Sequence, residues 1–170
     1  MELRDLYDEN KELTGETIYK GQDVPKGRYY ITVVVFIQNS KNEFLIQKRV
    51  KKKDGKWATT GGHPVSGETS KQGIITEIKE ELGVDIVKEN IKLFKTIKTE
   101  DDFVDIYYLK EDIDIKKIKI QKEEVEEVQW FDLEETYQQC RQHRDKFCVP
   151  LGGLQLVREF IKNNSNTIKE

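Results

Sequence analysis

The segment GHPVSGETSKQGIITEIKEELGV, residues 62–84, joins a glycine-rich turn to a stretch with helical periodicity. Its apolar residues fall on one arc when they are placed at 3.6 residues per turn; they are Ile74, Ile75, Ile78 and Leu82. Thr69 or Ser70 can cap the start of such a helix, and Gly83 suits the position just past its end. We therefore predict a helix from Thr69 to Leu82.

Three glutamates lie on one face of this predicted helix. Glu77, Glu80 and Glu81 have i, i+3 and i+4 spacing. They lie in the last turns, where the helix dipole disfavours each anion by about 0.3–1 kcal/mol. Like charges at these spacings cost a further ~0.2–0.5 kcal/mol per pair. A solvated acidic face would explain the three glutamates alone equally well, so the choice depends on the residues upstream.

Two glycines and a histidine lie upstream of the predicted helix. Gly61-Gly62 lets the backbone approach a metal ion or a phosphate more closely than a bulkier pair would. His63 follows the pair and is a candidate for contact with substrate. Carboxylate and carbonyl oxygens suit magnesium or manganese, with substrate phosphate oxygens completing the coordination. The combination favours a metal and phosphate site.

The pattern Gly62-x5-Glu68-x7-Thr76-Glu77-Ile78-x-Glu80-Glu81-x-Gly83-Val84 resembles the signature of the Nudix hydrolase family, whose members include the MutT-like proteins. The one departure is Thr76, because the family normally has an arginine that braces the loop and the glutamates. The run Val125 to Phe131 also resembles the strand and helix entry that close this fold. The resemblance implies an α/β (α+β) fold, an α/β/α sandwich with a mixed sheet.

The resemblance also implies roles for the residues of the signature. Glu77, Glu80 and Glu81 would be the catalytic and metal-binding carboxylates, with Glu77 a ligand or general base, and Gly61 would bind metal through its carbonyl. The cofactor would be Mg2+ or Mn2+. Supporting positions would not touch the reacting atoms; these are Gly62, Glu68, Thr76 and Gly83. A further acidic ligand from outside the signature would be one of Glu123, Glu124, Glu126, Glu127 or residues 100–102.

The rest of the chain supplies elements for a single domain covering residues 1–170. Residues 1–28 form an N-terminal hairpin extension, with the hairpin itself over 2–20, and residues 163–170 form a polar tail. We expect strands at 29–38, 43–49, 91–98, 103–109 and 125–131. We expect further helices beginning near Asp132 and covering Leu154 to Lys162. The expected strand at 29–38 is apolar enough to be buried on both faces of the sheet.

Three more residues outside the signature bear on chemistry. Arg49 ends a predicted strand leading toward it, where a guanidinium is a candidate for binding a phosphate. Cys140 and Cys148 are expected to be reduced thiols, because the start of the chain shows no export signal.

The composition limits the classes of partner that we expect this protein to bind. The formal net charge is -3, from 29 basic and 32 acidic side chains, which predicts no nucleic-acid footprint. No apolar run reaches membrane-spanning length, so we expect no membrane insertion and a cytoplasmic location. The N-terminal hairpin buries little by itself and is a candidate surface for a homodimer.

These features predict a metal-dependent enzyme that hydrolyses a phosphoanhydride bond in a small-molecule diphosphate, such as a nucleoside diphosphate-linked compound. Two alternatives stay open. The N-terminal layout and Gly62-His63-Pro64 resemble the isopentenyl-diphosphate isomerase subgroup, although Gly61 stands where that enzyme has its catalytic cysteine. Thr76 leaves room for a catalytically weak Nudix domain that binds nucleotide.

Overall fold

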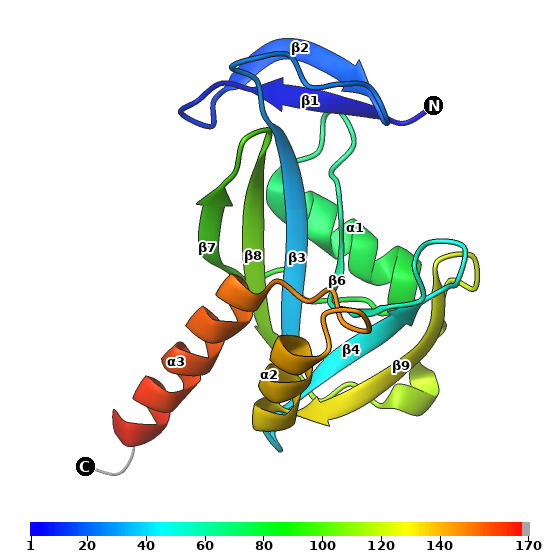
Figure 1. Cartoon of the computed structure of the whole chain (residues 1–170), viewed down its shortest axis with the longest axis vertical. Helices are drawn as coiled ribbons and strands as arrows, with labels where there is room; N and C mark the ends of the chain where they lie inside the picture. The colour runs from blue at the N-terminus through cyan, green and yellow to red at the C-terminus, as the bar shows by residue number, and fades with distance from the viewer. Residues whose placement is uncertain (168–170) are drawn as a thin grey trace.

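The computed structural model describes the backbone of residues 1–167 and the side chains of residues 1–164, and it shows helices on both faces of a mixed sheet (Figure 1). In chain order the elements are β1 (Leu3–Tyr7), β2 (Leu13–Tyr19), β3 (Tyr30–Gln38), β4 (Glu43–Arg49), β5 (Trp57–Ala58), β6 (Thr60–Gly62), α1 (Ser70–Leu82), β7 (Ile91–Lys98), β8 (Asp102–Lys110), the 3-10 turn η1 (Ile115–Lys117), β9 (Val125–Asp132), α2 (Leu133–Gln142) and α3 (Leu151–Thr167).

The central strand of the sheet is β3. It pairs in parallel with β8 and antiparallel with β6, while β9 and β5 both pair with β4. Its side chains alternate between two cores. Val33 and Val35 pack beneath α1, whereas Phe36 packs beneath α2 and α3. The prediction of a strand buried on both faces is confirmed for residues 35–38, whereas Tyr30, Thr32 and Val34 are only partly buried. The three-layer arrangement is confirmed.

Local chemistry fixes both ends of α1. The Thr69 hydroxyl accepts a hydrogen bond from the Gln72 backbone N–H at 3.2 Å, and the Gln72 side chain in return accepts from the Thr69 N–H at 2.8 Å. At the other end, Gly83 adopts a left-handed conformation with φ of 66° and donates its N–H to the Lys79 carbonyl. Thr69, not Ser70, is therefore the cap, and the predicted end at Leu82 is confirmed.

The structure adds detail to the expected strands and differs from the sequence-based expectation for the last helix. Strands β3 and β4 share only the register pair Gln38–Phe44, because β4 turns away to pair with β9. The two short strands β5 and β6 were not expected. Helix α3 begins at Leu151 and reaches Thr167, so the expected helix of residues 154–162 is too short and the expected polar tail is helical as far as 167. Residues 168–170 lie outside the described part of the chain.

The expected N-terminal hairpin is present as the antiparallel pair β1–β2, and it is fastened to the domain at several points. Tyr7 and Tyr29 exchange backbone hydrogen bonds of 2.7 and 3.0 Å. The Asp5 carboxylate accepts from the Ser66 hydroxyl at 2.6 Å and from the Gly67 N–H at 2.9 Å. Because Ser66 and Gly67 belong to the loop before α1, the hairpin contacts the segment on which the functional prediction rests.

A buried ion pair supplies the third attachment of the hairpin. The Lys11 ammonium lies 2.5 and 2.7 Å from the two carboxylate oxygens of Asp105 in β8, and Asp105 is 0% exposed. Hydroxyls of Ser70 and Thr96 also donate to this carboxylate. A fully buried carboxylate with these partners is stabilised, but it becomes costly as soon as its cation is removed.

We expect Lys11→Met to lower the free energy of unfolding by about 3 kcal/mol, because it leaves the Asp105 charge buried without a cation. Urea denaturation followed by circular dichroism measures this loss. Lys26→Met is the matched control, since Lys26 is an exposed lysine of the same N-terminal segment. Equal unfolding midpoints for both variants would show that the pair does not anchor the hairpin.

Candidate active site

A cleft of about 590 Å³ brings the predicted site residues together. Its floor comes from β4, β5 and β6, and one wall comes from α1. The expected residues that line it are Arg49, Gly61, Gly62, His63, Glu77, Glu80 and Glu81. Of the four expected supporting positions, Gly62 lines the cleft, whereas Glu68, Thr76 and Gly83 are not part of the lining.

The glycine pair is required by close packing. A Cβ on Gly62 would lie 2.0 Å from Oε1 of Glu77, so the absence of a side chain makes the space for that carboxylate. A Cβ on Gly61 would lie 2.4 Å from the Val33 carbonyl, across the β3–β6 pairing. The pair therefore allows β6 to lie close both to β3, its neighbour in the sheet, and to the Glu77 carboxylate of α1.

A hydrogen-bonded chain holds Glu81 in place. The Thr60 hydroxyl donates to Oε1 of Gln47 at 2.7 Å, and the Gln47 amide donates to Oε2 of Glu81 at 2.5 Å. Glu81 is only 8% exposed. Burial raises the pKa of its carboxyl, against the opposing effects of Gln47 and of the Lys53 and Arg49 charges. Gln47, which the sequence analysis did not identify, orients one of the three glutamates.

Glu77 has the most perturbed carboxyl of the three. Burial raises its pKa to about 7, and the charges of Glu81 and Glu80 act in the same direction. The backbone N–H of His63 offsets part of this shift. The predicted electrostatic crowding at the end of α1 is therefore present in the folded protein, and it falls mainly on Glu77.

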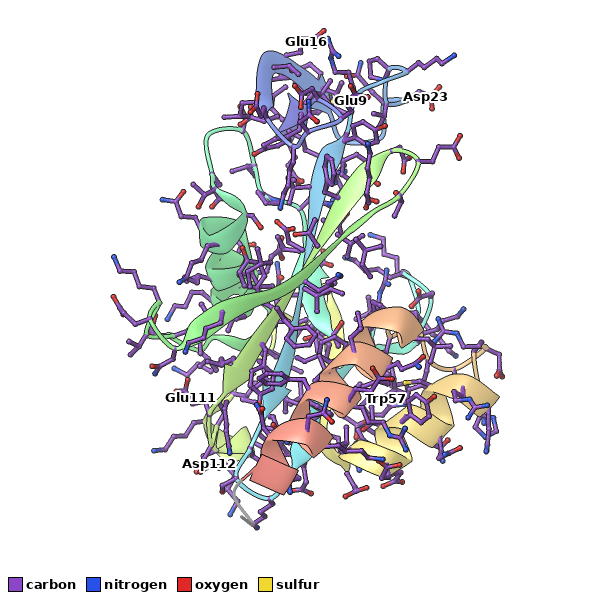
Figure 2. The ribbon with its side chains drawn as sticks, turned by 90° about the vertical axis from the view of Figure 1, so that its left-hand side faces the viewer. Glu9, Glu16, Asp23, Trp57, Glu111 and Asp112 are labelled. Atoms are coloured by element: carbon purple, nitrogen blue, oxygen red, sulfur yellow. The ribbon has the colours of Figure 1, made fainter. Side chains whose placement is uncertain are left out.

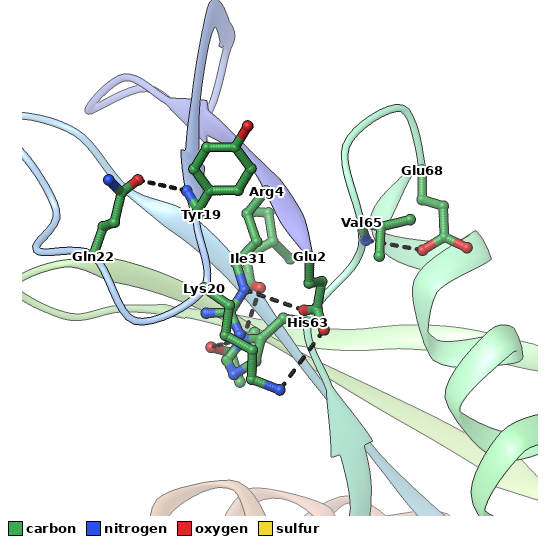
Figure 3. A network of polar contacts seen from close by, with 10 residues as sticks. Glu2, Arg4, Tyr19, Lys20, Gln22, Ile31, His63, Val65 and Glu68 are labelled. Carbon is green, nitrogen blue, oxygen red and sulfur yellow. Dashed lines mark hydrogen bonds and ion pairs between the residues drawn. The ribbon is translucent and has the colours of Figure 1, made fainter.

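Thr76 still braces the loop, although it stands at the position of the family's arginine. Its hydroxyl donates to Oε1 of Glu68 at 2.9 Å. Oε2 of Glu68 accepts the Val65 backbone N–H at 3.1 Å, as Figure 3 shows. Glu68 thus connects the middle of α1 to the loop that precedes it.

Both predicted substrate-binding residues lie at the cleft with partners of their own. Arg49 pairs with Asp54 at 3.3 Å, and its guanidinium lies 3.7 Å from the Cys148 sulfur. His63 lies with Nδ1 3.3 Å from the Ile31 carbonyl and also 3.3 Å from the Thr32 hydroxyl. Burial, together with the charge of Arg4, lowers the pKa of His63, which favours a neutral imidazole.

The structure distinguishes among the acidic residues expected from outside the signature. Glu124 lines the cleft and forms an ion pair with Lys53, whereas Glu126 pairs with Lys48 at 3.6 Å outside the lining. Asp102 is buried and accepts a hydrogen bond from Thr32 at 2.5 Å. Glu124 is therefore the member of that set with access to the cleft.

Three further lining residues come from the N-terminal hairpin: Glu2, Arg4 and Lys20. Sequence reasoning missed them because nothing in residues 1–28 signals chemistry, and only the folded hairpin brings them to the cleft. Both cysteines are free, as expected; Cys140 is buried, and Cys148 lies at the cleft.

The chemistry of the lining fits a divalent cation. Five acidic side chains face four basic ones there, so with all of them ionised the cleft repels rather than attracts a diphosphate. Hard carboxylate oxygens suit Mg2+ or Mn2+, and a bound cation would relieve the crowding that raises the pKa of Glu77. Among the described residues, no three acidic, histidine or cysteine side chains already converge as a finished metal site.

Comparison with known proteins agrees with this architecture. The family model described as NUDIX domain matches residues 28–149. An uncharacterized Nudix hydrolase of Listeria monocytogenes is 35% identical over 140 residues, which cover 79% of this chain and 82% of the relative. A crystal structure of DR0079 from Deinococcus radiodurans superposes with a TM-score of 0.72 at 20% identity, covering 92% of this chain and 98% of that one.

Two shorter matches are to enzymes of different chemistry. The isopentenyl-diphosphate Delta-isomerase of Pectobacterium atrosepticum is 34% identical over 83 residues, 46% of each chain. The dihydroneopterin triphosphate diphosphatase of Escherichia coli K12 is 32% identical over 69 residues, 41% of this chain and 45% of that enzyme. In the described residues, moreover, no helix combines the length and apolarity needed to cross a membrane.

The Glu77 carboxyl gives the metal-free protein a defined pH dependence. A pKa near 7 in the folded state, against 4.5 normally, means that the folded protein binds the proton more tightly. Its contribution to stability is complete below about pH 4.5 and disappears as the pH rises to about 7. We expect a loss on the order of 2 kcal/mol across this window, and Glu77→Gln should abolish it. Thermal unfolding in chelator at pH 5 and pH 8 tests both statements; an unchanged slope in the variant would contradict them.

The Thr76–Glu68 bond predicts a graded series at one position. Thr76→Val keeps the shape but leaves Glu68 without this donor, and should destabilise the protein by about 1 kcal/mol. Thr76→Ser keeps the donor and should stay near the wild type, while Thr76→Arg restores the family's residue and should be tolerated. Unfolding midpoints compare the four proteins. Equal stability of the valine and serine variants would show that the bond contributes nothing.

Proposed function

Because this chain belongs to the Nudix hydrolase family, we propose that its cleft hydrolyses a phosphoanhydride bond in a small diphosphate substrate, such as a nucleoside diphosphate-linked compound, with Mg2+ or Mn2+ as cofactor. The observation that carries the proposal is that one cleft is lined both by Glu77, Glu80 and Glu81 and by basic side chains. The basic side chains are Arg4, Lys20, Arg49 and Lys53. Carboxylates suit the cation, and arginine and lysine suit the phosphates.

In this proposal the three glutamates hold the metal, with the Gly61 carbonyl as a further ligand and Glu124 as the acidic candidate from outside the signature. When bound, the cation supplies charge neutralisation at the phosphoryl oxygens and a more acidic bound water. Gln47 and the Thr60 hydroxyl keep Glu81 oriented through their hydrogen bonds. Gly62 keeps the space in which Glu77 lies.

The remaining lining residues have separate tasks in the proposed reaction. Glu77 is the ligand or general base that the family signature implies, and its carboxylate lies in the cleft against Gly62. Arg49 and Lys53 bind phosphate oxygens by exchanging their present partners, Asp54 and Glu124, for substrate. His63, neutral and hydrogen-bonded to the backbone, contacts substrate as a polar group rather than as a cation.

The isomerase alternative is not favoured by the chemistry of the cleft. Gly61 occupies the position of the isomerase's cysteine, and the described lining offers only Val34, Ala58 and Pro150 as apolar side chains that could meet a hydrocarbon tail. The Cys148 thiol does reach the cleft, from a different part of the chain. An assay with isopentenyl diphosphate tests this alternative directly, and isomerisation without hydrolysis would replace the present proposal.

We expect magnesium-dependent release of phosphate or nucleotide from at least one member of a panel of diphosphates, measured with product analysis. The panel contains nucleoside diphosphate sugars, dinucleotides, coenzyme A and oxidised nucleotides. Chelation should abolish turnover, and Glu80→Gln or Glu81→Gln should reduce it at least about tenfold because each removes a metal ligand. Glu127→Gln is the matched control, an exposed glutamate of β9 outside the cleft. Turnover that survives chelation would contradict the proposal, and so would wild-type rates in both Glu80→Gln and Glu81→Gln.

A further inference from the structure

The N-terminal hairpin contributes to the wall of the cleft, although it lies before the region that the family model matches. The matched region begins at residue 28, whereas Glu2, Arg4 and Lys20 line the cleft. Glu2 lies between the two cations: its carboxylate is 3.4 Å from Nε of Arg4 and 3.7 Å from Nζ of Lys20 (Figure 3). The hairpin therefore presents two cationic side chains to the cleft, Arg4 and Lys20. Glu2 is the counter-ion that lies between them.

The hairpin backbone that carries Arg4 and Lys20 is anchored to the domain. Asp5, adjacent to Arg4, bonds to the loop before α1 through Ser66 and Gly67. Lys11 ties the turn of the hairpin to the buried Asp105. Side chains held on anchored strands lose less freedom when a ligand binds than side chains on a free segment do. The hairpin is thus built as a preorganised part of the cleft wall.

Arg4 is placed as an anion ligand. Its side chain is 10% exposed, and its guanidinium lies over the Tyr30 ring at 5.5 Å. The ring and the bond to Glu2 fix the plane of a group that carries five N–H donors in a fork suited to phosphate. Arg4 also lies close enough to His63 to lower its pKa, which places the charge next to the signature loop.

The four cations of the lining surround one site. Arg4 and Lys20 of the hairpin line the same cleft as Arg49 and Lys53. Burial lowers the pKa of Lys53, and the charges of Arg49 and Lys20 act in the same direction. Three acidic residues lie at the top of the molecule in Figure 2, away from the helices: Glu9 in the hairpin turn, Glu16 in β2 and Asp23 after β2. The described lining contains no phenylalanine, tyrosine or tryptophan on which a base could stack.

We propose that Arg4 and Lys20 bind a phosphate group of the substrate beyond the diphosphate that is cut. The substrate class is then a phosphate-rich compound with at least three phosphate groups, recognised by charge rather than by stacking of an aromatic base. This inference rests on the proposed function for the position of the scissile diphosphate. It adds a specificity element that the matched family region does not contain.

Binding of inorganic pyrophosphate and tripolyphosphate in magnesium, by titration calorimetry, tests the contact without an organic group. The wild type should bind tripolyphosphate more tightly than pyrophosphate, and Lys20→Ala and Arg4→Gln should each reduce this advantage on the order of tenfold. Lys20 is 62% exposed in its side chain, so that variant is expected to fold normally. Lys20→Arg should retain the advantage, and Glu2→Gln should increase tripolyphosphate affinity by removing the competing carboxylate. Lys26→Ala is the control.

Kinetics separate this inference from the proposed function. With a hydrolysed substrate that carries three phosphates, Lys20→Ala should raise KM about tenfold with kcat within about twofold, because it removes binding alone. Unchanged tripolyphosphate affinity and unchanged KM in Lys20→Ala, with metal-dependent hydrolysis intact, would overturn the hairpin contact and leave the proposed function standing. Absence of hydrolysis of every diphosphate would instead overturn the proposed function.

Discussion

The structure depends on placing three carboxylates at the C-terminal end of one helix. Neither the helix dipole nor the mutual repulsion of Glu77, Glu80 and Glu81 favours this arrangement, and burial of Glu77 and Glu81 adds to the cost. The surrounding packing tolerates it by local devices. Gly62 leaves space for one carboxylate, and Gln47 donates a hydrogen bond to another. A site assembled against its own electrostatics is a common mark of function.

The remainder of the fold can be understood as support for that helix end. Strand β3, which packs against both cores, fixes β6 beside it, and β6 carries the glycines against α1. The hydrogen bond of 2.9 Å between Thr76 and Glu68 then connects α1 to the loop between β6 and α1. The substitution of threonine for the family's arginine therefore changes the kind of brace and retains the connection.

The hairpin extends the same logic to the other side of the cleft. A two-stranded ribbon is marginal alone, and here it gains its position from a buried ion pair and from the bonds of Asp5 to the signature loop. The expectation that its surface serves a homodimer remains a prediction. What the structure shows is a hairpin whose inner face carries charge into the cleft.

The sequence by itself determined the family, the three-layer fold and the bounds of α1. It also determined that Glu77, Glu80 and Glu81 lie on one face of that helix. These depend on short-range patterns, because periodicity, capping and fixed spacing act within a few turns of chain. Only the tertiary structure decided that β4 leaves β3 for β9, that Glu124 reaches the cleft while Asp102 does not, and that Gln47 and Arg4 belong to the site. These facts depend on contacts between residues far apart in the chain, and such contacts leave no local pattern to detect.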